Sequence, residues 1–175
     1  MPFRTLRPAL LVLLPACFLA APAAGCAAPG GPVTTPEFET RLVLKNASGD
    51  EAREFRSGET ITLVVTIRNR AAAPRTLTLP TSQTHDCIVY AADHKEVWRH
   101  SLGRMFAQMI TELSLMPGES RSFTATWTQI DARGRPAPSG EYEAVGLVPG
   151  KAPGCRSEAV RFTIRPPATG KPAAP

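Results

Sequence analysis

The sequence predicts an all-β domain built as an antiparallel β-sandwich, and three observations support this prediction. Apolar and polar residues alternate in several short segments, most clearly in residues 61–67, ITLVVTI. A period of two is typical of half-buried strands. Turn signals separate these segments at short intervals, among them NASGD at 46–50 and MPGE at 116–119. No segment combines a sustained period of 3.6 residues with helix caps.

The other expected strands follow in order along the chain. Residues 85–93, HDCIVYAAD, and residues 96–100, EVWRH, each predict one strand. The alternating apolar residues of the remaining strands are Leu42 and Leu44, Leu77 and Leu79, Phe123, Ala125 and Trp127, and Val160, Phe162 and Ile164. Seven to nine short strands at this spacing indicate an immunoglobulin- or fibronectin-like sandwich in one domain, residues 38–166.

Residues 1–25 are predicted to be a signal peptide of the lipoprotein type. Two arginines precede an apolar run that prolines interrupt, which is the order of a secretory signal and too short for a transmembrane span. The segment AAGC at 23–26 resembles a bacterial lipobox, which would place lipid on Cys26. Ordinary cleavage near Ala28, which would release a secreted protein, is the alternative.

Lipid on Cys26 would anchor the protein in the bacterial cell envelope, because several acyl chains on one residue hold a protein on a bilayer. Ala27 follows Cys26, and by resemblance to other lipoproteins this favours the outer membrane or the periplasmic face. Residues 26–37 are rich in Pro, Gly and small residues and are expected to form a flexible tether. Residues 167–175 are expected to form a disordered tail.

The charge distribution excludes one class of partner. Lys and Arg number 20 against 15 Asp and Glu, a formal net charge of +5, and two of the arginines lie in the signal peptide. The charges are spread along the chain without a run of one sign. This balance is too weak for nucleic-acid binding.

Cysteine usage suggests one disulfide. With Cys26 assigned to the lipid and Cys17 to the signal peptide, Cys87 and Cys155 remain. Two thiols in an oxidising compartment make a candidate disulfide. It would close a long loop and stabilise the domain by about 4 kcal/mol.

Neither metal binding nor catalysis is expected. A soft-ligand metal site would have to use His85, Cys87, His94 and His100, yet no C-x-x-C or H-x-x-x-H pair is present. A hydrolase would have to use Ser82, His85, Asp86, His100 and Ser101, which are near neighbours in sequence, but the chain lacks a G-x-S-x-G elbow. We therefore predict no catalytic residue, no metal ligand and no cofactor.

Several motifs in residues 55–146 resemble one family. They are FRSGETITLVVTIRN at 55–69, DHKEVWRHS at 93–101, MFAQ at 105–108, LMPGES at 115–120, TW at 126–127 and GRPAPSGEY at 134–142. Together they resemble the intracellular proteinase inhibitor (BsuPI) domain family. His94 stands where the family pattern carries a turn glycine. The resemblance implies an immunoglobulin-like sandwich and inhibition of a serine protease.

Two functions follow from these features. One is a non-catalytic, membrane-anchored envelope lipoprotein whose domain binds a protein partner; the alternative is a proteinase inhibitor that blocks a serine protease through an exposed loop. The candidate loops are Ser101–Gln108, presenting Arg104 or Met105, and Ala132–Ser139. The candidate partner-binding residues are Trp98, Arg99, Arg104, Met105, Phe106, Gln108, Arg133 and Arg135.

For several side chains in residues 96–115, the sequence allows two directions. Trp98 either packs inward over the sheet or points outward beside His100, where it would serve as an interface anchor. Met105 and Met109 are either adaptable gap-fillers or contact residues. The core is expected to receive Phe106, Ile110, Leu113 and Leu115.

Overall fold

The computed structural model describes residues 36–167, which contain ten strands and no helix, and hence no helix that could cross a membrane. The predicted all-β class is confirmed, with one strand more than expected. The signal peptide, Cys26 and almost all of the tether and tail lie outside the described residues. The strands are β1 (Phe38–Lys45), β2 (Glu54–Arg56), β3 (Ile61–Asn69), β4 (Arg75–Leu79), β5 (Asp86–Ala91), β6 (Glu96–Arg99), β7 (Thr111–Leu115), β8 (Ser120–Trp127), β9 (Gly140–Leu147) and β10 (Val160–Arg165).

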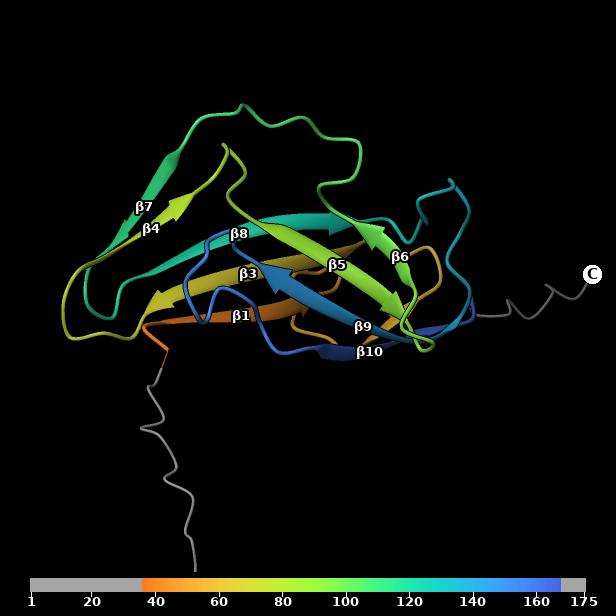
Figure 1. Ribbon diagram of the computed structural model, residues 1–175. Helices are drawn as coiled ribbons and strands as arrows, with labels where there is room; N and C mark the ends of the chain where they lie inside the picture. Colours follow the sequence, from red (N-terminus) through yellow and green to blue (C-terminus); the bar gives the residue numbers. More distant parts are fainter. Residues whose placement is uncertain (1–35, 168–175) are drawn as a thin grey trace, which may run out of the picture. The chain divides into compact units, whose positions relative to one another are not determined.

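Two sheets pack face to face, as in a β-sandwich. One has the strand order β1-β3-β8 and is antiparallel. The other has the order β2-β10-β9-β5-β6, and in it β2 runs parallel to β10. Figure 1 shows β5 and β9 crossing in front of β3 and β8, with β6 at the edge of the front layer.

The core lies between the two sheets and is filled by the alternating residues of each strand. In β3 the residues Ile61, Leu63, Val65 and Ile67 are all fully buried, as their spacing predicts. Trp127 lies at the centre, with its ring centroid 6.0 Å from that of Tyr142. Edge-to-face aromatic pairs of this kind stabilise a core beyond the area that they bury.

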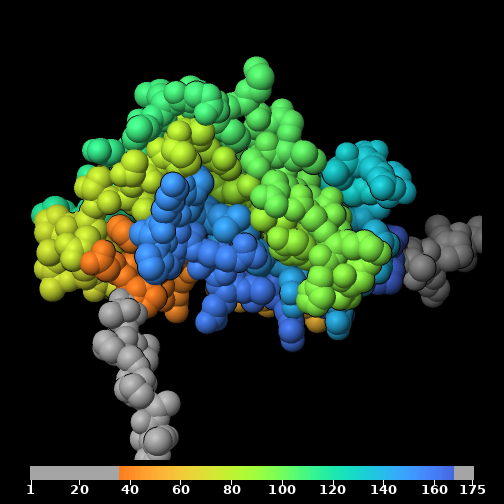
Figure 2. Space-filling model, viewed as in Figure 1, coloured from red at the N-terminus to blue at the C-terminus, as the bar shows by residue number. Residues whose placement is uncertain are grey.

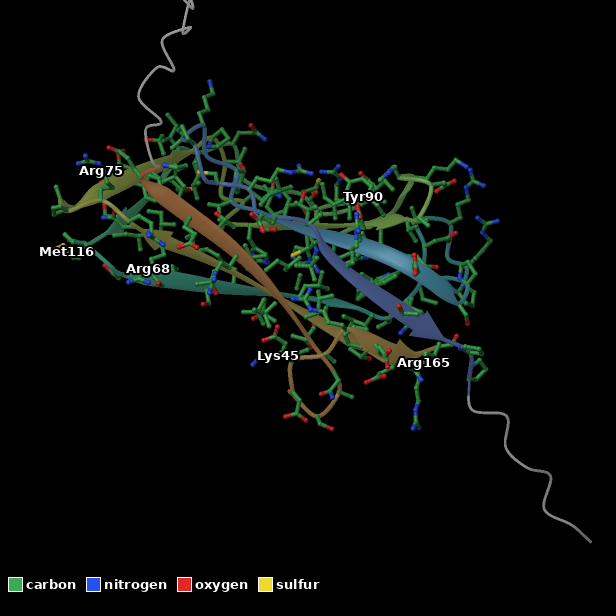
Figure 3. The ribbon with its side chains drawn as sticks, turned by 90° about the horizontal axis from the view of Figure 1, so that it is seen from below. Lys45, Arg68, Arg75, Tyr90, Met116 and Arg165 are labelled. Atoms are coloured by element: carbon green, nitrogen blue, oxygen red, sulfur yellow. The ribbon has the colours of Figure 1, made fainter. Side chains whose placement is uncertain are left out.

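The remaining strands, β4 and β7, form a separate two-stranded ribbon at one end of the sandwich. Arg75 and Met116 mark its outer end in Figure 3, in agreement with the pairing of Arg75 with Leu115. The buried Asn69 side chain joins the ribbon to β3, because its amide group donates to the carbonyl oxygens of Ala73 (3.0 Å) and Leu115 (2.9 Å). Burying this amide is tolerable only because its hydrogen bonds are made.

The turn between β5 and β6 contains His94 with a φ of 60°. A positive φ is unusual for any residue but glycine, although histidine tolerates it better than most. Glycine would adopt this conformation without strain, so the turn is compatible with glycine at position 94.

Candidate functional site

The connection between β6 and β7, residues 100–110, holds four of the six large apolar side chains that are exposed among the described residues. Its four large exposed side chains are Leu102 (57%), Met105 (99%), Met109 (57%) and Ile110 (72%). The segment forms the upper rim of the molecule in Figures 1 and 2. Exposed apolar residues gathered in one segment are typical of interaction sites.

Ile110 is therefore not a core residue, and that prediction is wrong. The inward positions of β7 are Leu113, which packs against the core, and Leu115, which is fully buried. Side chains of an extended segment alternate between the two faces, so a residue three positions before Leu113 points away from the core. Phe106 is half-buried and is not part of the buried core cluster.

The first end of the connection is held by Asp86, a buried carboxylate at the start of β5. Its oxygens accept hydrogen bonds from the backbone N–H of Ser101 (3.0 Å) and from the Ser101 hydroxyl (2.7 Å). The guanidinium of Arg99 also donates to Asp86 at 3.3 Å. It donates two further hydrogen bonds to the carboxylate oxygens of Glu96. Hydrogen bonds to a charged acceptor are stronger than neutral ones, so Asp86 fastens the chain where it leaves β6.

The second end is held by Ser82, in the segment that leads into β5. The Ser82 N–H donates to the carbonyl oxygen of Ala107 (3.0 Å), and the Ala107 N–H donates to the Ser82 hydroxyl (2.9 Å). A tight turn with Gly103 at a φ of 74° follows Ser101. Residues 104–106, of which Arg104 and Met105 are exposed and Phe106 is half-buried, thus lie between two hydrogen-bonded anchors. Such an arrangement lowers the entropy cost of binding a partner.

Two stacked histidine rings belong to residues next to the first anchor, because His85 directly precedes Asp86 and His100 directly precedes Ser101. The ring centroids of His85 and His100 are 4.9 Å apart, and His85 also stacks on Phe123 at 5.3 Å. His85 Nε2 lies 3.2 Å from the carbonyl oxygen of Thr124 and must donate to it, which leaves Nδ1 to accept from the Thr84 hydroxyl in the neutral ring. Within the described residues, His100 Nδ1 is buried without a hydrogen-bond partner.

Both histidines are held in the neutral form. Burial is the main cause that lowers the pKa of His85 and of His100, and the positive charge of Arg104 lowers both further. The nearby Asp86 acts in the opposite direction on both rings, and the Thr124 carbonyl does so on His85. Because the rings are stacked, a proton on one also disfavours a proton on the other.

Acidification is expected to destabilise the domain as the pH falls below about 6.5. The unfolded chain binds protons at histidine near pH 6.5, whereas the folded pKa values are lower. The unfolded state therefore binds more protons in this range of pH, and the free energy of unfolding falls as the pH falls. Urea denaturation at several pH values should show this slope. His100→Phe should flatten it, whereas the exposed His94→Gln should not; a flat wild-type curve would contradict the expectation.

One protein-family model matches this chain, and the match covers the exposed connection described above. The model of the family described as BsuPI, intracellular proteinase inhibitor, matches residues 38–153, more than half of the chain. The chain belongs to the BsuPI family. The matched segment includes the β6–β7 connection and both of its anchors. It ends before β10, although β10 pairs with β9 and completes the second sheet of this BsuPI domain.

Solved structures resemble the BsuPI domain only distantly. The C-terminal domain of wzt is 10% identical, with a TM-score of 0.49 and 75% of each chain covered. The alkylpurine DNA glycosylase AlkC from Pseudomonas fluorescens is 18% identical, with a TM-score of 0.45, and a β-glucosidase from Listeria innocua is 12% identical, with a TM-score of 0.40. The match to the glycosylase covers 75% of this chain and 31% of the enzyme. The match to the β-glucosidase covers 74% of this chain and 16% of the enzyme. No curated protein matches. None of these likenesses bears on function.

The structure brings only some of the candidate partner-binding residues together. Arg104, Met105 and Gln108 are exposed on the β6–β7 connection, with the half-buried Phe106 among them. Trp98 packs inward against the core, with its ring centroid 6.1 Å from that of Trp127, so the inward alternative is the one observed. The Arg99 guanidinium forms ion pairs with the carboxylates of Asp86 and Glu96.

Arg133 and Arg135 belong to a different turn, between β8 and β9. The Asp131 carboxylate accepts from the backbone N–H groups of both arginines and from the Arg135 guanidinium. The Ala132 N–H donates to the Val97 carbonyl oxygen (3.1 Å), which places this turn beside β6. The turn is thus well ordered but presents charge rather than apolar surface.

The serine, histidine and aspartate residues that were considered for catalysis do converge, but their hydrogen bonds are structural. The Ser101 hydroxyl donates to Asp86, and the Ser82 hydroxyl accepts from Ala107. Neither serine is bonded to a histidine nitrogen within residues 36–167. The sequence analysis considered these residues only for catalysis, which it did not predict, and it did not foresee that Asp86 and Ser82 anchor the connection. Across the described part of the chain, no three His, Cys, Asp or Glu residues form a group that could hold a metal ion.

The candidate disulfide between Cys87 and Cys155 is not formed, and both residues are free, buried thiols. Cys87 pairs with Gly146 on one side of β9. On the other side, the Val148 N–H donates to the Cys155 carbonyl oxygen. Strand β9 therefore separates the cysteines by about two strand spacings, roughly 9–10 Å, which exceeds the reach of a disulfide. Burial, with a smaller effect of Asp86, raises the pKa of the Cys87 thiol to about 12, so it remains protonated.

Proposed function

We propose that this BsuPI domain inhibits a protease by inserting the β6–β7 connection into the active-site cleft. The observation that carries the proposal is the segment Arg104–Phe106, with Arg104 and Met105 exposed, in a connection that hydrogen bonds to Asp86 and Ser82 hold at both ends. Membership of a proteinase inhibitor family supports it. A protease is thus a more specific partner than the unspecified envelope protein that the sequence first suggested.

The backbone of this segment supports the same function. Within the described residues, Met105 and Phe106 make no backbone hydrogen bond, and neither lies in a turn. Their N–H and C=O groups are free to pair with an extended edge of a partner, as in peptide recognition by strand addition. A pre-ordered segment with unpaired backbone groups is what binding in a substrate cleft requires.

The turn at Ala132–Ser139 supports inhibition less well. Its best-placed side chain, Arg135, already pairs with Asp131 at 2.9 Å. Presenting Arg135 to a protease would break that pair, whereas Met105 has no contact to lose. The β6–β7 connection is therefore the site that we propose.

Inhibition constants test the proposal. The mature chain should inhibit at least one serine protease of a panel of trypsin-like, chymotrypsin-like and subtilisin-like enzymes at micromolar concentration or below. A variant with Arg104→Gly, Met105→Ser and Phe106→Gly should retain the fold by circular dichroism but bind at least 100-fold more weakly. Absence of inhibition across the whole panel would contradict the proposal.

We also propose that lipid on Cys26 displays the inhibitor at the surface of an envelope membrane. The support is the AAGC segment that precedes a Pro- and Gly-rich stretch in the sequence. The mass of the mature N-terminal peptide distinguishes a diacylated or triacylated Cys26 from an unmodified terminus near Ala28. An unmodified terminus would contradict the anchor and leave the inhibitor as a secreted protein.

A further inference from the structure

Met105 differs from every other apolar side chain described. It is 99% exposed, while Phe106 beside it is half-buried. A Met side chain is unbranched and adaptable, so it can enter a narrow apolar pocket. Because it makes almost no contact within the domain, its burial by a partner would cost no interaction inside the inhibitor.

The side chains around Met105 give the same chemical character to the whole connection. Leu102, Met109 and Ile110 are each more than half exposed. Between His100 and Thr111, Arg104 is the only charged residue. A cleft complementary to this segment must therefore be largely apolar on both sides of the pocket that receives Met105.

Arg104 is the rival for the central position, since it is exposed and directly precedes Met105. Its backbone N–H donates to the Ser101 carbonyl oxygen at 3.1 Å, which ties Arg104 to the turn. Its positive charge acts on both rings of the histidine pair. Arg104 thus interacts with its own domain, whereas Met105 does not.

We infer that Met105 is the specificity-determining residue of the inhibitor and that its target is a serine protease with an apolar primary pocket. The inference rests on the proposed function, because it assumes that the β6–β7 connection enters the cleft. It adds the class of protease and the residue that selects it. A protease with a carboxylate at the base of its primary pocket would leave that charge unpaired against Met105 and should be inhibited poorly.

The test measures inhibition constants of the mature chain against subtilisin and chymotrypsin, whose primary pockets are apolar, and against trypsin, whose primary pocket holds an aspartate. The wild type should favour an apolar-pocket enzyme over trypsin by about tenfold or more. Met105→Asp should weaken that inhibition by about 100-fold, and Met105→Leu by less than about threefold. Met105→Lys should shift the preference toward trypsin, while Arg104→Ala should weaken inhibition far less than Met105→Asp and leave the preference between the enzymes unchanged.

The outcomes separate the two proposals. If the wild type inhibits none of the three enzymes, the proposed function fails and the inference fails with it. If the wild type inhibits but the Met105 variants leave the constants unchanged, or if Arg104→Ala alone abolishes inhibition, only the inference is overturned. Thermal unfolding should show equal stability for all variants, because Met105 and Arg104 are exposed.

Discussion

Replacing Asp86 by alanine is expected to destabilise the domain by about 3 kcal/mol and to weaken protease inhibition about tenfold or more. Asp86 is buried and accepts two hydrogen bonds from Ser101 and one from Arg99. Its removal leaves these donors without their charged acceptor, which costs more than the loss of neutral hydrogen bonds. The β6–β7 connection would lose its first anchor and would have to be ordered at the expense of binding energy.

The inhibition constant must be separated from the loss of stability. Ile164→Ala is a suitable control, because Ile164 is fully buried in β10 and the change should cost about 2–5 kcal/mol. Urea denaturation gives the free energy of unfolding of both variants, and inhibition is measured at a temperature where both are folded. Ile164→Ala should inhibit as well as the wild type. Full inhibition by Asp86→Ala would show that the anchor does not matter for binding.

Gly154→Ala is expected to destabilise the domain by about 3 kcal/mol or more, for two reasons that add. Gly154 has a φ of +88°, where an L side chain is strained by about 1–2 kcal/mol. A Cβ atom would also lie 1.7 Å from the Phe38 carbonyl oxygen, so the loop would have to leave β1. That movement would break the hydrogen bond from the Thr40 hydroxyl to the Gly154 carbonyl oxygen, 2.7 Å long and worth about 1 kcal/mol.

Gly49→Ala provides the matched control for this prediction. Gly49 has the same φ of +88°, but nothing lies within 4 Å of its added Cβ. It isolates the backbone strain, and we expect a cost of about 1 kcal/mol in urea denaturation. If the two variants lose equal stability, the close packing of Gly154 on β1 would be refuted.

The sequence predicted the strands because their physics is local. Alternation in residues 61–67 and at Leu42, Leu44, Phe162 and Ile164 reports directly which side chains face the core, and the structure buries all of them. The prediction failed at Ile110, because nothing local shows that β7 begins one residue later and faces inward at Leu113 and Leu115. Short apolar segments at strand ends give no clue to their register.

The long-range polar contacts could not be predicted. Gln129 is fully buried with a φ of 59°, and its amide bonds to the backbone of Arg56, Gly58 and Glu59, about 70 residues earlier in the chain. Asp86 was predicted only as a neighbour of His85 and Ser101, and its role as anchor depends on how β5 and β6 pair. The prediction of a disulfide failed for the same reason. The strand order, which local sequence does not reveal, places β9 between Cys87 and Cys155.

The candidate site was predicted in part for a similar reason. The segment SLGRMFAQ was expected to be a loop, and its exposure is confirmed at Arg104, Met105 and Gln108. Its two anchors were not expected, since Ser82 and Ala107 are far apart in sequence and meet only in the fold. Residue types predict which loop could be recognised, whereas its rigidity follows from the tertiary contacts.

The central claim is that the β6–β7 connection occupies the active-site cleft of a protease. It is tested most directly by measuring the affinity of the mature chain for two forms of one inhibited serine protease, by calorimetry or surface plasmon resonance. One form carries alanine in place of its catalytic serine and has an open cleft; the other has its cleft filled by a covalent peptidyl blocker. We expect binding at micromolar concentration or below to the open form and no measurable binding to the blocked form. Equal affinity for the two forms would place the contact outside the cleft and contradict the mechanism.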